Sequence, residues 1–146
     1  MTENRPLVLG GVTVPYARGL AGHSDADVVL HAVCDALLGA SALGDIGELF
    51  PDTDPRYRGI NSGALLEAVL ARVRQAGWAI VNVDLVIHVE QPKLGGYKSE
   101  IRRNIARILE LDASLVGVKA KTGEGVGPIG RSEAISCEAV VLIDKR

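Results

Sequence analysis

The apolar positions of this chain recur with two periods, one typical of helices and one typical of strands. Helical spacing predicts three helices, over about 28–38, 61–76 and 98–109. Short β-prone runs around Gly10-Gly11 predict a hairpin, and further strands are expected over 78–89, 115–121 and 133–143. Strands and helices intermix with no linker between them. The pattern therefore predicts one domain over residues 1–146 of the α/β (α+β) class, a mixed β-sheet with helices on one face.

The first helix carries a polar stripe on an otherwise apolar surface. Ser24 followed by Asp27 is typical of a capping box, with Asp in place of the usual Glu or Gln. Asp27, His31 and Asp35 are four residues apart and so share one face of the helix. His31 is either a hydrogen-bonded core residue or a metal ligand whose second ring nitrogen contacts a neighbouring carboxylate. The spacing alone leaves both interpretations open.

Two other stretches carry candidate chemistry. Residues 44–58 contain two prolines and four acids, so we expect a loop, which is either functional or a solvated connector. Residues 122–132 form a glycine-rich stretch, which is either a phosphate-binding loop or a plain flexible hairpin. The side chains beside its backbone donors are Lys119, Lys121, Thr122 and Arg131. It is not a Walker loop, because no Gly-Lys-Ser/Thr opens a helix there.

Composition narrows the class of protein. Only 3% of the 146 residues are aromatic although 47% are hydrophobic, so aliphatic side chains must form the core. A net charge of −2 without a basic block argues against a nucleic-acid partner. No apolar run reaches the roughly 20 residues of a membrane span and no secretory signal is present, so we expect a cytoplasmic protein with no membrane partner. Cys34 and Cys137 lie in apolar segments, which predicts buried thiols rather than a disulfide.

Collinear motifs from about Leu7 onward resemble the 2-C-methyl-D-erythritol 2,4-cyclodiphosphate synthase family of the non-mevalonate isoprenoid route. The resemblance covers nearly the whole chain. It is carried by His23-Ser24-Asp25-Ala26-Asp27, His31, Asp35-Ala36-Leu37-Leu38-Gly39-Ala40, Gly44-Asp45-Ile46-Gly47, Phe50-Pro51-Asp52-Thr53-Asp54, Asn82-Val83-Asp84, Pro92-Lys93, Val118-Lys119-Ala120, Glu124, Gly130-Arg131 and Glu133.

The resemblance implies an assembly and a reaction. The family is a homotrimer with helices outside, sheets lining the middle and active sites between neighbouring subunits. Its substrate is 4-diphosphocytidyl-2-C-methyl-D-erythritol 2-phosphate, a small molecule that contains cytidine diphosphate. The 2-phosphate attacks the β-phosphorus, CMP leaves and the cyclic diphosphate forms. Positioning and charge neutralisation dominate such phosphoryl transfers.

The resemblance also implies site residues. His31 matches a ligand of Zn²⁺ or a similar divalent transition metal, and Glu124 matches the ligand of a bridging Mg²⁺ or Mn²⁺. His23 and Thr122 match the catalytic pair, and Glu138 matches an acid near the trimer axis. The matched substrate-binding residues are His23, Ser24, Asp45, Ile46, Gly47, Phe50, Pro51, Asp52, Thr53, Asp54, Val89, Glu90, Gln91, Pro92, Lys93, Leu94, Gly95, Lys121, Thr122, Gly123, Glu124 and Arg131.

The chain departs from the family pattern in three places. Lys121 and Gly123 replace two of three threonines, and Pro128 replaces an aromatic residue. The family's Asp-x-His, which supplies two more zinc ligands, is missing, so we expect a start site downstream of the true one, weak zinc binding and little cyclase activity. Two other functions stay open: a catalytically silent trimer that binds isoprenoid or cytidine phosphates, and an unrelated metal-dependent phosphohydrolase that uses His23, Asp25 and His31.

Overall fold

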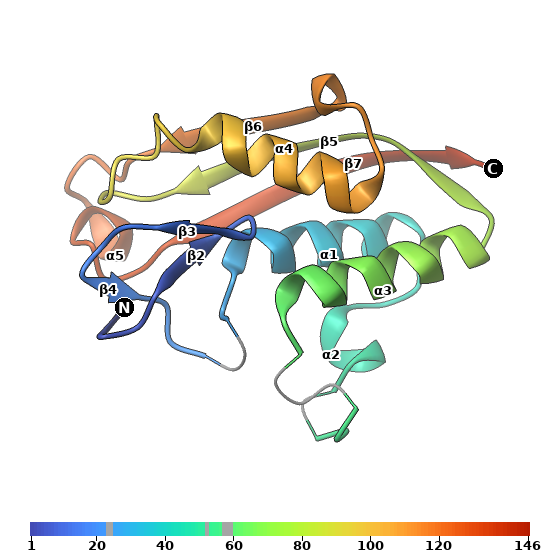
Figure 1. The fold of residues 1–146 in the computed structure, drawn as a ribbon, viewed down its shortest axis with the longest axis horizontal. Coiled ribbons are helices and arrows are strands. Elements are labelled where there is room, and N and C mark those ends of the chain that lie inside the picture. The colour runs from blue at the N-terminus through green and yellow to red at the C-terminus, as the bar shows by residue number, and fades with distance from the viewer. Residues whose placement is uncertain (23–24, 52, 57–59) are drawn as a thin grey trace.

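A three-stranded mixed sheet forms the frame of the molecule in the computed structural model, which describes residues 1–22, 25–51, 53–56 and 60–146 (Figure 1). The central strand β5 (Trp78–His88) runs parallel to β6 (Val116–Lys121) and antiparallel to β7 (Ser136–Lys145). The register of β5 against β7 shifts between Ile80 and Asn82. These pairings confirm the predicted mixed sheet.

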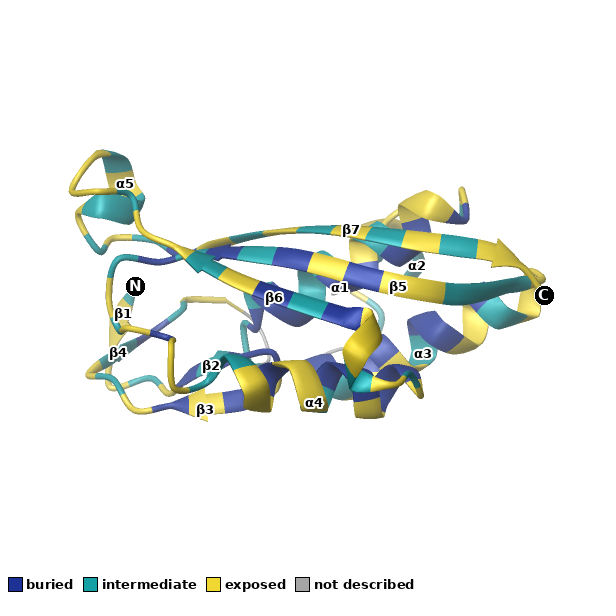
Figure 2. Ribbon diagram, turned by 90° about the horizontal axis from the view of Figure 1, so that it is seen from above, coloured by how far each residue is buried: buried dark blue, intermediate teal, exposed yellow. Residues whose placement is uncertain are grey.

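Three long helices cover one face of this sheet, as predicted (Figure 2). They are α1 (Val28–Ala40), α3 (Ser62–Gln75) and α4 (Lys98–Leu109). Each buries an apolar stripe at three- and four-residue spacing; in α4 this stripe includes Ile101, Ile105 and Ile108. No helix within the described ranges is long and apolar enough to cross a membrane.

The opposite face of the sheet carries no helix and is exposed (Figure 2). Exposed and half-buried side chains alternate along β7, where Val140 is 72% and Leu142 is 57% exposed. Polar side chains lie on the same face: the Lys119 Nζ forms an ion pair with Asp84 Oδ2 at 2.8 Å, and the His88 Nε2 is 3.8 Å from Glu138 Oε1. This mixed apolar and charged surface is available for contact with another molecule.

Two pairs of short strands lie at one end of the domain. The predicted hairpin consists of β2 (Leu7–Leu9) and β3 (Val12–Val14), joined by Gly10 and Gly11 at φ of 63° and 78°. Two consecutive positive φ values are what a type I′ hairpin turn requires. In addition, β1 (Thr2–Glu3) pairs with β4 (Arg18–Gly19), two strands that the sequence pattern did not predict. Strands of two residues are too short to show a period.

Two segments expected to be loops contain single-turn helices. The first, α2 (Ile46–Leu49), lies within 44–58, where Asp45 Oδ1 accepts the Glu48 N–H at 2.9 Å. The second, α5 (Gly127–Gly130), lies in the glycine-rich stretch. A further 3-10 turn, η1 (Ala113–Leu115), precedes β6. Helices of three or four residues have no apolar stripe, so the periodicity did not indicate them.

The start of α1 differs from the predicted capping box. Asp27 is itself the N-cap, and its carboxylate accepts the N–H groups of Val29 and Leu30 at 3.1 and 3.0 Å. The same carboxylate accepts the N–H groups of Gly10 and Gly11 at 2.9 and 2.6 Å. The prediction that Asp27 is the N3 residue of a capping box with Ser24 as the N-cap is therefore wrong. Ser24 itself lies outside the described residues. Asp27 joins the hairpin to the helix.

Both cysteines are free thiols, as predicted, but only Cys34 is buried, whereas Cys137 is half-buried. Burial raises the pKa of Cys34 strongly, and it raises the pKa of Cys137 to about 12. Since the thiolate is the reactive species, we expect iodoacetamide to label the native protein at pH 8 on the order of 1,000-fold more slowly than the protein unfolded in guanidinium. Intact-mass measurements over time would test this. Native labelling as fast as unfolded labelling would contradict the burial of the two thiols.

Candidate functional site

The ends of β5 and β6 bring two predicted site segments together. Because these strands are parallel, the loop after β5 and the glycine-rich stretch after β6 leave the sheet at the same edge. The Val89 N–H donates to the Lys121 carbonyl at 2.8 Å and joins the two segments. A cavity of about 320 Å³ lies directly at this junction. Its walls are Val89, Pro92, Lys93, Leu94, Gly95, Lys98, Ala120, Lys121 and Thr122.

The electrostatic character of this cavity, the β5–β6 cavity, is positive. Lys93, Lys98 and Lys121 all line it, and within the described part of the chain none of the three ammonium groups forms an ion pair. Unpaired cations around a small cavity suit an anionic ligand such as a diphosphate. Lys98 is a residue that the sequence reasoning missed, because as the first residue of α4 it was assigned to the helix alone.

The glycine-rich stretch is held in place by an acid from the facing loop. Glu90 Oε1 accepts the Gly123 N–H at 3.0 Å and the Gly125 N–H at 3.5 Å. These two backbone donors, which could have bound a phosphate, therefore already have a partner. Thr122 Oγ1 accepts the Glu124 N–H at 3.2 Å, which leaves the hydroxyl proton of Thr122 free to be donated.

Close backbone contact explains one departure from the family pattern. A Cβ atom on Gly123 would lie 2.7 Å from the Gly130 nitrogen and 2.9 Å from the Val126 carbonyl oxygen. Both neighbours are backbone atoms of α5 or its N-cap, so a side chain at position 123 would force this turn to move. Glycine is therefore required at 123 by the way the loop folds onto α5.

Arg131, expected to face a phosphate, binds an acid of its own segment. Its Nε and Nη2 lie 3.0 and 3.2 Å from the two carboxylate oxygens of Glu133. This bidentate contact lowers the pKa of Glu133 and raises that of Arg131. Both side chains are exposed. To bind a ligand, the Arg131 guanidinium would have to leave the Glu133 carboxylate, or contact the ligand and Glu133 at the same time.

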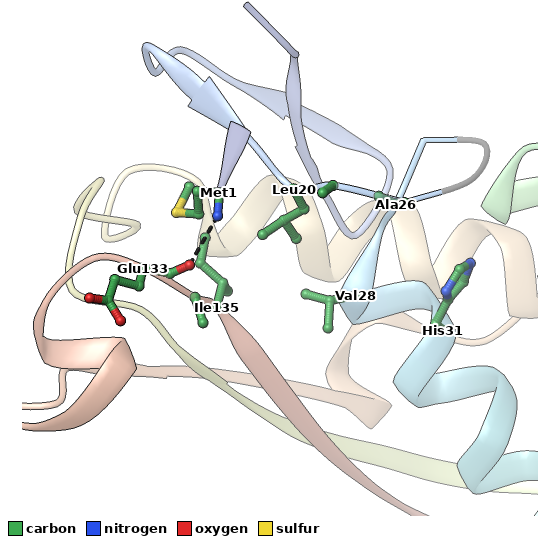
Figure 3. Close-up of a pocket in the computed structure, with 10 residues that line it drawn as sticks. Met1, Leu20, Ala26, Val28, His31, Glu133 and Ile135 are labelled. Carbon is green, nitrogen blue, oxygen red and sulfur yellow. Dashed lines mark hydrogen bonds between the residues drawn. The ribbon is translucent and has the colours of Figure 1, made fainter. Parts of the chain in front are cut away.

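His31 lies at a second cavity of about 520 Å³, between the start of α1, the N-terminal segment and the residues that lead into β7 (Figure 3). We call it the His31 cavity; its other walls are Met1, Leu20, Ala21, Gly22, Ala26, Val28, Glu133, Ala134 and Ile135. The His31 Nε2 lies 3.0 Å from the hydroxyl oxygen of Ser62, and that hydroxyl donates to Asp25. The sequence reasoning missed Ser62 as a partner of His31.

The acids expected beside His31 have other partners. Asp27 binds the hairpin and the start of α1, as described above, and Asp35 Oδ1 accepts the Ile46 N–H at 2.9 Å. Among the described residues, neither the Asp27 nor the Asp35 carboxylate is hydrogen-bonded to the His31 ring, so neither makes the carboxylate contact that one interpretation of His31 required. Helical spacing places the three residues on one face, but each carboxylate reaches a different neighbouring segment.

The acidic segment after α1 forms a third group. Asp45, Ile46 and Gly47 lie at the start of α2, and the ring of the buried Phe50 lies 5.2 Å from the Arg72 guanidinium. Beyond it, Asp54 forms an ion pair with Arg56 at 2.9 Å. Pro51 is half-buried and Thr53 is exposed. Three predicted residues, His23, Ser24 and Asp52, lie outside the described residues.

These groups do not converge within one chain. Among the residues that the structure describes, none lines both the β5–β6 cavity and the His31 cavity. In both views α2 lies well away from the ends of β5 and β6 where the lysines gather (Figures 1 and 2). A ligand that contacts all of the predicted residues would therefore have to contact more than one copy of the chain.

The donor sets fit the two expected metals differently. A catalytic zinc normally has three protein ligands. The described residues contain no group of three His, Cys, Asp or Glu side chains that could hold a metal, so His31 alone does not make a zinc site there. Magnesium needs only one or two carboxylates in addition to substrate phosphates. Glu124, exposed and beside Thr122, fits that requirement.

Comparison with known proteins identifies the family. The model of the YgbB family matches residues 1–144, and the chain belongs to this family. A 2-C-methyl-D-erythritol 2,4-cyclodiphosphate synthase from Bordetella pertussis is 57% identical over 143 residues, which are 98% of this chain and 88% of that protein.

Solved structures agree with this assignment. The bifunctional IspDF of Campylobacter jejuni superposes with a TM-score of 0.93 at 43% identity, over 99% of this chain and 39% of that longer one. A CDP-bound 2C-methyl-D-erythritol-2,4-cyclodiphosphate synthase superposes with a TM-score of 0.90 at 40% identity, over 97% of this chain and 92% of that one. The fold and an enzymatic role in isoprenoid synthesis are thus those of these relatives.

Proposed function

We propose that this chain converts 4-diphosphocytidyl-2-C-methyl-D-erythritol 2-phosphate to 2-C-methyl-D-erythritol 2,4-cyclodiphosphate and CMP. The observation that carries the proposal is the positive β5–β6 cavity, formed by the segments that match the family's cytidine diphosphate site. A related enzyme has been solved with CDP bound. The proposed activity is that of a phosphorus–oxygen lyase.

In the proposed reaction, an oxygen of the 2-phosphate attacks the β-phosphorus of the diphosphate. The bond from the β-phosphorus to the bridging oxygen breaks, and CMP leaves with that oxygen. Lys93, Lys98 and Lys121 neutralise phosphate charge at the β5–β6 cavity, and the Thr122 hydroxyl donates to the phosphoryl group in transfer. A Mg²⁺ or Mn²⁺ ion held by Glu124 would supply further charge neutralisation when bound.

The direct test is single-turnover reaction of stoichiometric protein with this substrate, with Mg²⁺ and Zn²⁺ added and products followed by phosphorus NMR. We expect CMP and the cyclic diphosphate to appear together in equal amounts. Release of inorganic phosphate would instead favour a phosphohydrolase. Substrate binding without any product would favour a catalytically silent binding protein.

Zinc binding is expected to be weak, because the described residues place no group of three possible ligands around His31. Protein dialysed against metal-free buffer should retain substoichiometric zinc, measured by atomic absorption. His31→Ala should lower the remaining zinc further, and His88→Ala, which removes a histidine on the open sheet face, serves as the control. Zinc retained at one ion per chain after dialysis would contradict this expectation.

We propose further that the active protein is a homotrimer with its helices outside and its active sites between subunits. The exposed sheet face, with its apolar Val140 and Leu142, supports a buried position for that face in an assembly. The separation of the β5–β6 cavity from α2 and His31 within one chain supports a site shared between copies.

Subunit mixing tests the shared site. Two inactive variants, His31→Ala and Thr122→Ala, are dissociated, mixed and reassembled. If His31 and Thr122 serve one site from different chains, some mixed trimers contain an intact site, and CMP release should recover to a measurable fraction of the wild-type rate. Mixing two batches of the same variant is the control. Trimers that form without any recovery would argue against sharing.

A further inference from the structure

A fully buried serine connects the first and third helices beside His31. Ser62 is the first residue of α3 and is 0% exposed. Its hydroxyl lies between the Asp25 carboxylate and the His31 ring. Asp25 and His31 are 37 and 31 residues away from Ser62 in the sequence, so this contact comes from the packing of α1 against α3.

The Asp25 carboxylate determines the direction of these hydrogen bonds. Its oxygens accept the Ser62 N–H at 3.0 Å, the Asp27 N–H at 3.2 Å and the Ser62 O–H. A hydroxyl has one proton, and here that proton is directed to the carboxylate. The oxygen of Ser62 can then only accept a hydrogen bond from His31.

The direction of the last bond determines which ring nitrogen of His31 carries the proton. In a neutral imidazole one nitrogen donates and the other accepts. Because Nε2 lies 3.0 Å from an oxygen that must accept, Nε2 carries the proton and Nδ1 keeps its lone pair. An unprotonated ring nitrogen is the atom that accepts a hydrogen bond, takes a proton or binds a cation.

We propose that Ser62, oriented by Asp25, is a positioning residue that holds His31 as the Nε2–H tautomer with Nδ1 as its reactive atom. The inference deepens the proposed function and rests on it for its catalytic meaning, because it gives His31 a defined acceptor atom at its cavity. The hydrogen-bond geometry itself does not depend on which reaction the protein catalyses. Ser62 acts through His31 and is not itself assigned a contact with substrate.

Nitrogen-15 NMR of the histidine side chains, at a pH where they are neutral, reads the tautomer directly. We expect a protonated Nε2 and an unprotonated Nδ1 for His31, assigned by the signals lost in His31→Ala. A protonated Nδ1 in the wild-type protein would overturn the proposal. So would a Ser62→Val variant whose His31 nitrogen shifts are the same as those of the wild type.

Matched variants separate the hydroxyl from the volume of the side chain. Ser62→Thr keeps the hydroxyl, whereas Ser62→Val has nearly the same shape without it. We expect the Thr variant to keep the wild-type His31 signals and the Val variant to lose the single-tautomer pattern. Ser41→Ala is the control: it removes another buried hydroxyl, at the far end of α1, where it binds the Leu37 and Leu38 carbonyls. It should leave the His31 signals unchanged.

CMP release measured on the same proteins connects the tautomer to the reaction. Loss of a partner that orients a functional histidine typically costs about 10- to 100-fold in activity. We expect such a loss in Ser62→Val, with most of it recovered in Ser62→Thr. Equal activities of the Thr and Val variants would overturn the positioning role. A wild-type protein with the expected tautomer that releases no CMP would instead contradict the proposed function alone.

Discussion

Thr122→Ala is expected to lower kcat for CMP release by about 100- to 1,000-fold and to leave KM nearly unchanged. The hydroxyl oxygen of Thr122 accepts the Glu124 N–H, and its proton is free to be donated to a ligand at the β5–β6 cavity. A donor that strengthens its contact only as charge develops on the transferring phosphoryl group stabilises the transition state more than the bound substrate.

Steady-state kinetics with added Mg²⁺ and Zn²⁺ would measure this effect. Thr122→Ser keeps the hydroxyl and should retain most of the activity. Thr13→Ala, in β3 and exposed, is the control for a threonine removed from elsewhere on the surface. A variant whose KM rises while kcat stays constant would show that Thr122 binds substrate without acting on the transition state.

The second large effect is expected on stability, at Asp27. Its buried carboxylate accepts four backbone N–H groups, two from α1 and two from the hairpin turn. Asp27→Ala removes a helix cap, at about 1 kcal/mol, and leaves buried donors unpaired, at about 1–3 kcal/mol each. We expect the free energy of unfolding to fall by on the order of 3–5 kcal/mol, and Tm by roughly 10 °C.

Asp27→Asn separates the loss of hydrogen bonds from the loss of charge. The amide oxygen can accept the three N–H groups now held by Oδ1, but the amide nitrogen would face the Gly11 N–H. Its cost should therefore be intermediate. Asp112→Ala, which removes an exposed cap of η1, should cost less than either. Thermal unfolding would measure Tm for each variant. Equal decreases in Tm for all three variants would contradict the central role of Asp27.

The pH dependence of stability has a defined sign at this residue. Burial raises the pKa of Asp27 above its usual value, although the backbone donors oppose the shift. A raised pKa means that folding favours the protonated carboxyl. Its contribution to stability is therefore fully present below the unfolded-state pKa and is lost as pH rises through the folded-state pKa. In Asp27→Asn this part of the pH dependence should disappear.

Periodicity predicted the parts of the fold that are long enough to repeat. The stripe of Ile101, Ile105 and Ile108 placed α4, and the apolar run after Trp78 placed β5. It could not indicate α2 or α5, since a four-residue helix makes little more than one turn. The pairing of β1 with β4 depends on a contact between two dipeptides, which no local pattern encodes.

The candidate site was predictable where it follows from motifs and not where it follows from packing. The motifs predicted residues 89–95 and Lys121-Thr122 as parts of a substrate site, and the parallel register explains why these two segments line one cavity. Ser62 was not indicated, because its contacts with Asp25 and His31 exist only after α3 packs on α1. Helical spacing proposed Asp27 and Asp35 instead, since it describes one helix and not its neighbours.

The contact between Gly123 and Gly130 also limits how this sequence can change over time. The family pattern that this sequence resembles has a threonine at the position of Gly123, but here a Cβ atom would meet the α5 backbone. A threonine at position 123 would therefore disturb the fold of this loop unless the turn at 127–130 changed as well. We expect position 123 and the turn that contains Gly130 to vary together. A side chain at position 123 that fits a different turn would not fit the turn of this chain.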